Sequence, residues 1–251
     1  MLADLGYDGV ALTPDVQHLD PFRSTAAEIE QVRAHLERRG LGVTLESGAR
    51  FLLDPRRKHF PTLLGKNGGT RQQFLVKLLE LSRELGSPLV SIWSGARDQD
   101  TPEGAEAFDL LAERLKPLLE QADKLGVMLC FEPEPGMLVE RIAQYHELRA
   151  RLEGAELWLT VDTGHLVVNE RAPYHEHLLR ERASLRNLHL DDAFPGIHQH
   201  LEFGDGKLDF PAVWDALETI QYDGPVSVEL SRHSHAAPQV AERAIRFLRD
   251  L

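Results

Sequence analysis

The stretch GVMLCFE at residues 126–132 decides the fold, because it reads as a short buried strand that ends on an acidic residue. Three later stretches repeat this pattern with a metal-binding side chain near the end: LWLTVD at 157–162, LRNLHL at 185–190 and VSVEL at 226–230. The four side chains are Glu132, Asp162, His189 and Glu229. Residues at the C-terminal ends of the strands in a parallel barrel meet on one face. The pattern therefore predicts one divalent metal ion at the mouth of a barrel.

Longer amphipathic stretches, such as residues 101–125 and 211–220, separate these strands and have the composition of helices. Alternation of strands and helices predicts a parallel sheet covered by helices. The expected strands are seven: residues 9–13, 41–46, 88–93, 126–132, 157–162, 185–190 and 226–230. We therefore expect an α/β fold, a (β/α)8 TIM barrel that lacks its first strand and most of its first helix. Because an open strand edge favours pairing with another chain or collapse of the gap, a homo-oligomer or a poorly soluble chain is a further hypothesis.

Composition supports one soluble domain, residues 1–251, since a (β/α)8 barrel has roughly 250 residues and 42% of this chain is apolar. No apolar run reaches the ~20 residues of a membrane span, and the first residues do not resemble a signal peptide. The lone Cys130 excludes an internal disulfide, so we expect a cytoplasmic protein. The formal net charge of −12 argues against nucleic acid as a partner.

Two long loops, residues 47–70 and 191–207, follow expected strands and should lie over the mouth of the barrel. The first loop is basic, so a small anion is a candidate ligand there. Its basic residues are Arg50, Arg56, Arg57, Lys58, His59, Lys66 and, just beyond the loop, Arg71.

Four further motifs occur in order along the chain: VDTGH at 161–165, HLDD at 189–192, FGDGKLDF at 203–210 and YDGPVSVEL at 222–230. With these motifs the chain resembles the xylose-isomerase-like TIM-barrel superfamily of sugar isomerases and epimerases. That superfamily includes ketose 3-epimerases, inosose dehydratases and endonuclease IV.

The resemblance implies a metal site, because Glu132, Asp162, His189 and Glu229 match the ligand positions of the family. Three carboxylates and one imidazole favour Mn²⁺, Mg²⁺ or Co²⁺ and leave Zn²⁺ as an alternative. In family members that move a carbonyl or invert the carbon beside it, the two glutamates exchange protons with the substrate. Glu132 and Glu229 are therefore the expected catalytic residues, working through a metal-bound enediolate.

Other residues are candidates for binding the substrate, and each also has a structural explanation as a helix start, a rigid turn, barrel filling or a solvated loop residue. His165 matches a family position that contacts the substrate oxygen near the metal. The remaining candidates are Glu134, Glu46, Trp93, His200, Glu202, Arg232, Lys58 and His59.

The endonuclease branch carries an Asp-x-His pair where this chain has His198-Gln199-His200, and it needs histidines on earlier strands that are missing here. A nuclease is therefore disfavoured. We expect a divalent-metal-dependent isomerase or epimerase of a sugar, sugar acid or cyclitol, with a sugar phosphate as one option. The alternatives are a keto-cyclitol dehydratase of the same superfamily and a barrel that binds a metabolite without turnover.

Overall fold

Parallel strands alternate with helices along the chain, as the sequence predicts. The computed structural model describes residues 1–251. It divides them into two compact units, one made of residues 9–158 and the other of residues 1–8 together with 159–251. None of the helices combines the length and the hydropathy that a membrane span requires. The expectations of a single domain and of a homo-oligomer stay predictions.

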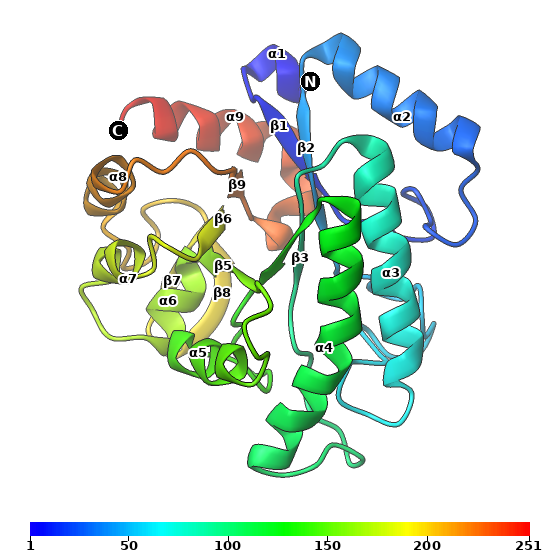
Figure 1. The fold of residues 1–251 in the computed structure, drawn as a ribbon. Helices are drawn as coiled ribbons and strands as arrows, with labels where there is room; N and C mark the ends of the chain where they lie inside the picture. Colours follow the sequence, from blue (N-terminus) through cyan, green and yellow to red (C-terminus); the bar gives the residue numbers. More distant parts are fainter. The chain divides into compact units, whose positions relative to one another are not determined.

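The unit of residues 9–158 contains four parallel strands in sequence order. They are β1 (Gly9–Leu12), β2 (Gly42–Glu46), β3 (Leu89–Ile92) and β4 (Met128–Phe131). Its helices are α2 (Ala26–Arg39), α3 (Gly68–Leu85), α4 (Ala105–Leu125) and α5 (Ile142–Ala150). All four residues of β3 are buried, which is typical of a parallel strand covered on both faces. Helices α3 and α4 lie side by side (Figure 1).

The boundaries of these helices follow from local sequence. Helix α2 starts at a capping box, in which the Thr25 hydroxyl accepts a hydrogen bond from the backbone N–H of Glu28 and the Glu28 carboxylate accepts one from the backbone N–H of Thr25. The helix ends at Gly40, whose φ of 65° is accessible to glycine without a steric penalty. Helix α4 ends in the same way at Gly126 and leads directly into β4.

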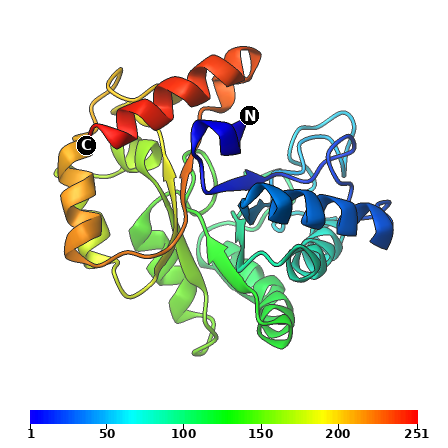
Figure 2. The same cartoon turned by 90° about the horizontal axis from the view of Figure 1, so that it is seen from above.

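The other unit contains three parallel strands in the order β5 (Trp158–Asp162), β6 (Leu185–Leu190) and β9 (Val226–Val228). Its helices are α1 (Leu2–Leu5), α6 (Thr163–Asn169), α7 (His175–Arg180), α8 (Phe210–Thr219), the 3₁₀ helix η1 (Ser231–Ala236) and α9 (Ala237–Arg249). Figure 2 shows that α1 and α9, from opposite ends of the sequence, lie side by side. The Tyr7 hydroxyl donates to the carbonyl of Ala241 at 2.8 Å, and Arg249 Nη2 donates to the carbonyl of Leu5 at 3.1 Å.

One part of the fold differs from the sequence prediction. Residues 191–207, expected as an irregular loop, contain an antiparallel hairpin of β7 (Asp192–Phe194) and β8 (Ile197–Leu201). The turn between them contains Pro195 and Gly196, and Gly196 has a φ of 72°. By contrast, residues 47–67 form the expected connection without regular structure before α3.

Candidate metal and substrate site

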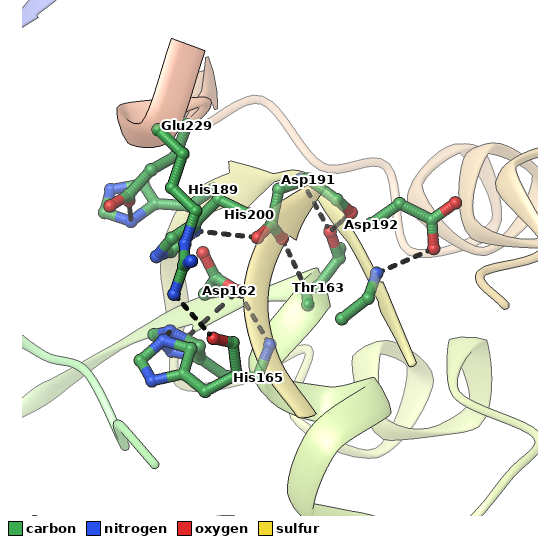
Figure 3. Close-up of polar contacts among 12 residues, drawn as sticks. Asp162, Thr163, His165, His189, Asp191, Asp192, His200 and Glu229 are labelled. Atoms are coloured by element: carbon green, nitrogen blue, oxygen red, sulfur yellow. Dashed lines mark hydrogen bonds and ion pairs between the residues drawn. The ribbon is translucent and has the colours of Figure 1, made fainter. Parts of the chain in front are cut away.

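The register of β5, β6 and β9 brings three predicted metal ligands together. Asp162 at the end of β5 pairs directly with His189 in β6. Glu229 directly follows β9, and its backbone N–H donates to the carbonyl of Leu190 at 2.9 Å. The ligand atoms of Asp162, His189 and Glu229 all lie within 4.8 Å of one another (Figure 3). Side chains two residues or fewer from the strand ends thus form one compact group with two carboxylates and an imidazole.

The Asp162 carboxylate has two different environments. Its Oδ1 atom accepts a hydrogen bond of 2.7 Å from the backbone N–H of His165 and so caps the start of α6. Its Oδ2 atom is buried and has no hydrogen-bond partner. Because a buried carboxylate oxygen without a partner is costly, this atom indicates a ligand that the protein is built to bind.

Glu229 and His189 form an ion pair, with His189 Nδ1 lying 2.9 Å from Glu229 Oε2. Burial alone would raise the pKa of Glu229, but the hydrogen bond and charge of His189, followed by the charges of His200 and His165, lower it to about 2. Glu229 is therefore ionised at neutral pH, as a metal ligand must be. On the other side of the ring, His189 Nε2 lies 3.1 Å from the amide nitrogen of Asn187.

A second group consists of three histidines beside Asp162: His165 in α6, and His198 and His200 in β8. The Nε2 atoms of His165 and His198 lie 3.1 Å apart, and His200 Nδ1 lies 2.8 Å from the Asp191 carboxylate. Their ligand atoms also lie within 4.8 Å of one another. Imidazole ligands alone suit Zn²⁺ or Cu²⁺ rather than Mg²⁺.

The histidines of this group carry different charges. Burial alone would lower the pKa of His200, but its hydrogen bond to Asp191 and the charges of Asp162, Glu229 and Asp191 raise it to about 10. Burial, followed by the charges of His165 and His200, lowers the pKa of His198 to about 4. At neutral pH the group therefore offers a cationic His200, which can donate a hydrogen bond to a substrate oxygen, beside a neutral His198.

The Asp192 carboxylate organises the loop that follows β8. Its two oxygens accept hydrogen bonds of 2.8–3.1 Å from the backbone N–H groups of Ala193, Gly204, Gly206, Lys207 and Leu208. A Cβ atom at Gly206 would lie 2.3 Å from Asp192 Oδ1, so only glycine fits there. The second half of the HLDD motif therefore has a structural role.

The predicted residues of the unit 9–158 lie at the ends of its strands and in the loop after β2. Glu132 follows β4, is 6% exposed, and its backbone N–H donates to the carbonyl of Ile92 at 2.7 Å. Glu46 ends β2, Trp93 follows β3, and Glu134 begins the turn after β4; all three are half-buried. In the loop, His59 is half-buried and Lys58 is exposed.

Two predicted substrate contacts have other partners. Both carboxylate oxygens of Glu202 accept hydrogen bonds from Arg243 of α9, at 2.8 and 2.6 Å. Arg232 in η1 donates to the carbonyl of His198 at 3.1 Å. These contacts tie α9 and η1 to the hairpin region, and the substrate-binding roles of Glu202 and Arg232 stay predictions.

The sequence suggested no role for Asp191, and it suggested Arg71 only as one of the basic residues of a candidate anion site. Asp191 accepts a hydrogen bond from the backbone N–H of Gly164 at 2.6 Å as well as contacting His200. Arg71 is 2% exposed and donates to three backbone carbonyls. The HLDD motif was a usable signal for Asp191, whereas the role of Arg71 depends on the path of a loop that local sequence does not reveal.

Comparison with known proteins identifies the family. The sequence model of the family described as xylose isomerase-like TIM barrel matches residues 1–251. Inosose dehydratase from Lacticaseibacillus casei is 26% identical over 141 residues, or 49% of this chain and 47% of that protein. Inosose dehydratase from Geobacillus thermodenitrificans is 25% identical over 165 residues, or 58% of this chain and 55% of that protein. The chain thus aligns with about half the length of the curated relatives it matches.

Solved structures agree on the fold. An L-ribulose 3-epimerase superposes with a TM-score of 0.78 at 21% identity, over 98% of this chain and 84% of that chain. The 3-keto-D-glucoside 4-epimerase of E. coli superposes with a TM-score of 0.78 at 18% identity, over 99% and 91% of the two chains. At these identities the likeness establishes the fold, not the reaction. The fold prediction is confirmed, and the chain belongs to the xylose isomerase-like TIM barrel family.

Proposed function

We propose that the protein is a divalent-metal-dependent isomerase or epimerase that acts on a sugar, a sugar acid or a cyclitol. The observation that carries this proposal is the group of Asp162, His189 and Glu229, together with the buried Asp162 Oδ2 atom that has no hydrogen-bond partner. In this proposal Glu132, the buried carboxylate after β4, is the fourth ligand. The oxygen-rich donor set suits Mn²⁺, Mg²⁺ or Co²⁺, with Zn²⁺ as the alternative.

When bound, the metal supplies a Lewis acid that acidifies the C–H group beside the substrate carbonyl. The carboxylate of Glu132 or Glu229 removes this proton, and the electron pair moves onto the carbonyl oxygen to give an enediolate. The other glutamate, ionised in the resting site, takes up a proton from solvent during turnover and returns it to carbon. Return to the opposite face of the same carbon is an epimerisation. Return to the neighbouring carbon is an isomerisation, in which the hydroxyl proton on the first carbon also moves to the former carbonyl oxygen.

The three histidines support this chemistry. The cationic His200 can donate a hydrogen bond to a substrate oxygen that gains negative charge, and Asp191 orients its ring. In this proposal His165 contacts a substrate oxygen beside the metal. Glu46, Trp93 and Glu134 complete the substrate-binding residues from the strand ends of the other unit.

A second candidate is the dehydration of a keto-cyclitol, which is favoured by the inosose dehydratases among the relatives. The first proton transfer is the same. The protonated glutamate then gives its proton to the neighbouring hydroxyl, which leaves as water, so that a carbon–oxygen bond breaks and a double bond forms.

Product analysis in D₂O distinguishes the two reactions. Incubation of the Mn²⁺-loaded protein with ketoses and inososes should give an isomer that carries one deuterium on the reacting carbon if the protein is an epimerase. A dehydratase instead gives a product with new ultraviolet absorbance. Glu132→Gln should lower turnover by at least the ~10²- to 10⁴-fold typical of a lost acid–base group, whereas Glu218→Gln, an exposed change on α8, should not. Full activity of Glu132→Gln would contradict the assignment.

A further inference from the structure

Two aromatic side chains form a corner in the unit of residues 9–158. The imidazole of His59, in the loop after β2, meets the indole of Trp93, after β3, edge to face at 5.5 Å between ring centroids and 83° between ring planes. His59 has a φ of 65°, which non-glycine residues rarely adopt. A strained backbone persists only where the surroundings impose it, and such positions are concentrated at functional sites.

Arg71 of α3 is one of the residues that hold the backbone at His59, beside the carbonyl of Arg50, which accepts from the His59 N–H at 2.7 Å. The Arg71 side chain is buried and donates from Nη2 to the carbonyl of His59 at 2.7 Å, from Nε to Pro61 at 2.9 Å and from Nη1 to Ser47 at 3.0 Å. The guanidinium carbon also lies 4.8 Å from the centroid of the Trp93 ring. One planar cation thus binds the start of the loop, its His59 segment and the Trp93 ring at once, a geometry that lysine cannot provide.

The hydrogen bonds of His59 select one tautomer. Its Nδ1 atom lies 2.7 Å from the carbonyl of Gly48. Because a carbonyl only accepts, Nδ1 carries the proton, and Nε2 of the neutral ring is left as an acceptor. Burial, followed by the charges of Lys58, Arg71 and Arg50, lowers the pKa of His59 and so favours the neutral ring.

The corner lies at the strand ends that carry the proposed catalytic carboxylate. Trp93 follows Ile92, which pairs with Phe131, and Glu132 follows Phe131. The neighbouring strand β2 ends at Glu46, which pairs with Ser91. His59, Trp93 and Glu132 therefore belong to one edge of the β2–β3–β4 sheet.

We propose that His59 is a specificity-determining residue that accepts a hydrogen bond from a substrate hydroxyl through Nε2, and that Arg71 is the residue that positions it. This inference rests on the proposed function and narrows its substrate class. A neutral acceptor binds a free hydroxyl and disfavours a carboxylate or phosphate at that position, because at neutral pH a carboxylate has no proton to donate and a phosphate is largely deprotonated. The substrate is thus a polyol with an unmodified hydroxyl next to the corner, rather than one phosphorylated there.

The tautomer can be tested without any turnover. Long-range ¹H–¹⁵N spectra of histidine-labelled protein at pH 7 should contain one ring with a protonated Nδ1 and a bare Nε2 that disappears in His59→Gln and persists in His35→Gln, an exposed change on α2. Arg71→Lys should convert this ring to a mixture of tautomers, whereas a merely structural Arg71 would lower stability and leave the tautomer unchanged. A His59 ring that is protonated at Nε2 in the wild type would overturn the proposal.

Substrate recognition is tested next. In an active preparation, His59→Phe should raise KM roughly 2- to 12-fold, the effect of one lost hydrogen bond, with kcat and bound metal unchanged. His59→Gln, which keeps an acceptor oxygen, should lose less. Unchanged KM in His59→Phe would refute the recognition role while leaving the proposed reaction intact.

Absence of turnover would contradict the proposed function without testing the role of His59. In that case D-tagatose and an inosose serve as binding probes. At saturating concentration one of them should shift the Nε2 resonance of His59, and the shift should be absent in Arg71→Lys. If neither probe shifts that resonance, His59 does not bind a hydroxyl.

Discussion

Asn187 is not a candidate metal ligand, but it contacts the ring of His189 and can fix which nitrogen of that ring carries the proton. Its Oδ1 atom is buried without a hydrogen-bond partner, while its amide nitrogen lies against His189 Nε2. A metal bound through Nδ1 of His189 requires the proton of the neutral ring to be on Nε2. Rotation of the Asn187 amide by half a turn then makes Oδ1 the acceptor of that proton. The buried Oδ1 atom thereby gains a partner, and the His189 ring is held in the tautomer that binds the metal.

From this arrangement we predict that Asn187→Leu lowers the affinity for Mn²⁺ about 10- to 100-fold, the usual effect of losing a partner that orients a ligand. Competition with a chromogenic chelator measures this change. Asn187→Asp keeps an acceptor oxygen and should retain most of the affinity. Equal affinity of Asn187→Leu and wild type would show that His189 does not depend on this amide.

Because of His200, the free energy of unfolding of the metal-free protein should depend on pH in a direction that can be worked out. Its pKa is raised from 6.5 to about 10 in the folded state, mainly because Asp191 and two further carboxylates outweigh burial. The folded state therefore binds the proton more tightly, and the stability this provides is complete below pH 6.5 and is lost as the pH rises through about 10. Urea unfolding between pH 6.5 and 10 should show the free energy of unfolding falling in the wild type and falling less in His200→Gln. Parallel curves for the two proteins would be inconsistent with an ion pair at His200.

At the scale of elements, the hairpin of β7 and β8 depends on Asp192. Five backbone N–H groups donate to one buried carboxylate, and hydrogen bonds to a charged group contribute about 1.5–3 kcal/mol each without being additive. We predict that Asp192→Ala lowers the free energy of unfolding by at least about 3 kcal/mol. Asp205→Asn, an exposed change in the same loop, should stay within about 0.5 kcal/mol. Similar urea midpoints for both variants would contradict this role.

Strands and helices of the barrel were predictable because their signals are local. Apolar runs such as residues 126–132 and 157–162 were recognisable as strands, and Gly40 and Gly126 marked the ends of helices. The hairpin was missed because its strands are only three and five residues long, too short for a clear apolar run. Pro195-Gly196 between them is a turn signal that could have indicated it.

At the scale of the whole molecule, the candidate ligands were predictable for the same reason. Each lies at the end of an apolar strand or within one residue of it, and residues at the C-terminal ends of neighbouring parallel strands share an edge of their sheet. The contacts of Asp191 and Arg71 were not predictable, since each depends on backbone atoms from other segments, Gly164 in one case and residues 47–61 in the other. Local patterns thus indicate the candidate ligands, and only the folded chain shows the residues that orient the groups around them.

The metal content of the purified protein tests the central claim most directly. After loading with Mn²⁺ and dialysis, mass spectrometry should find about one tightly bound ion per chain in the wild type and in Glu218→Gln, and a substantial loss of it in Glu229→Gln, because a site lacking one charged ligand binds weakly. Absence of bound metal under every loading condition, or equal metal in Glu229→Gln, would contradict the assignment of Asp162, His189 and Glu229 as a metal site.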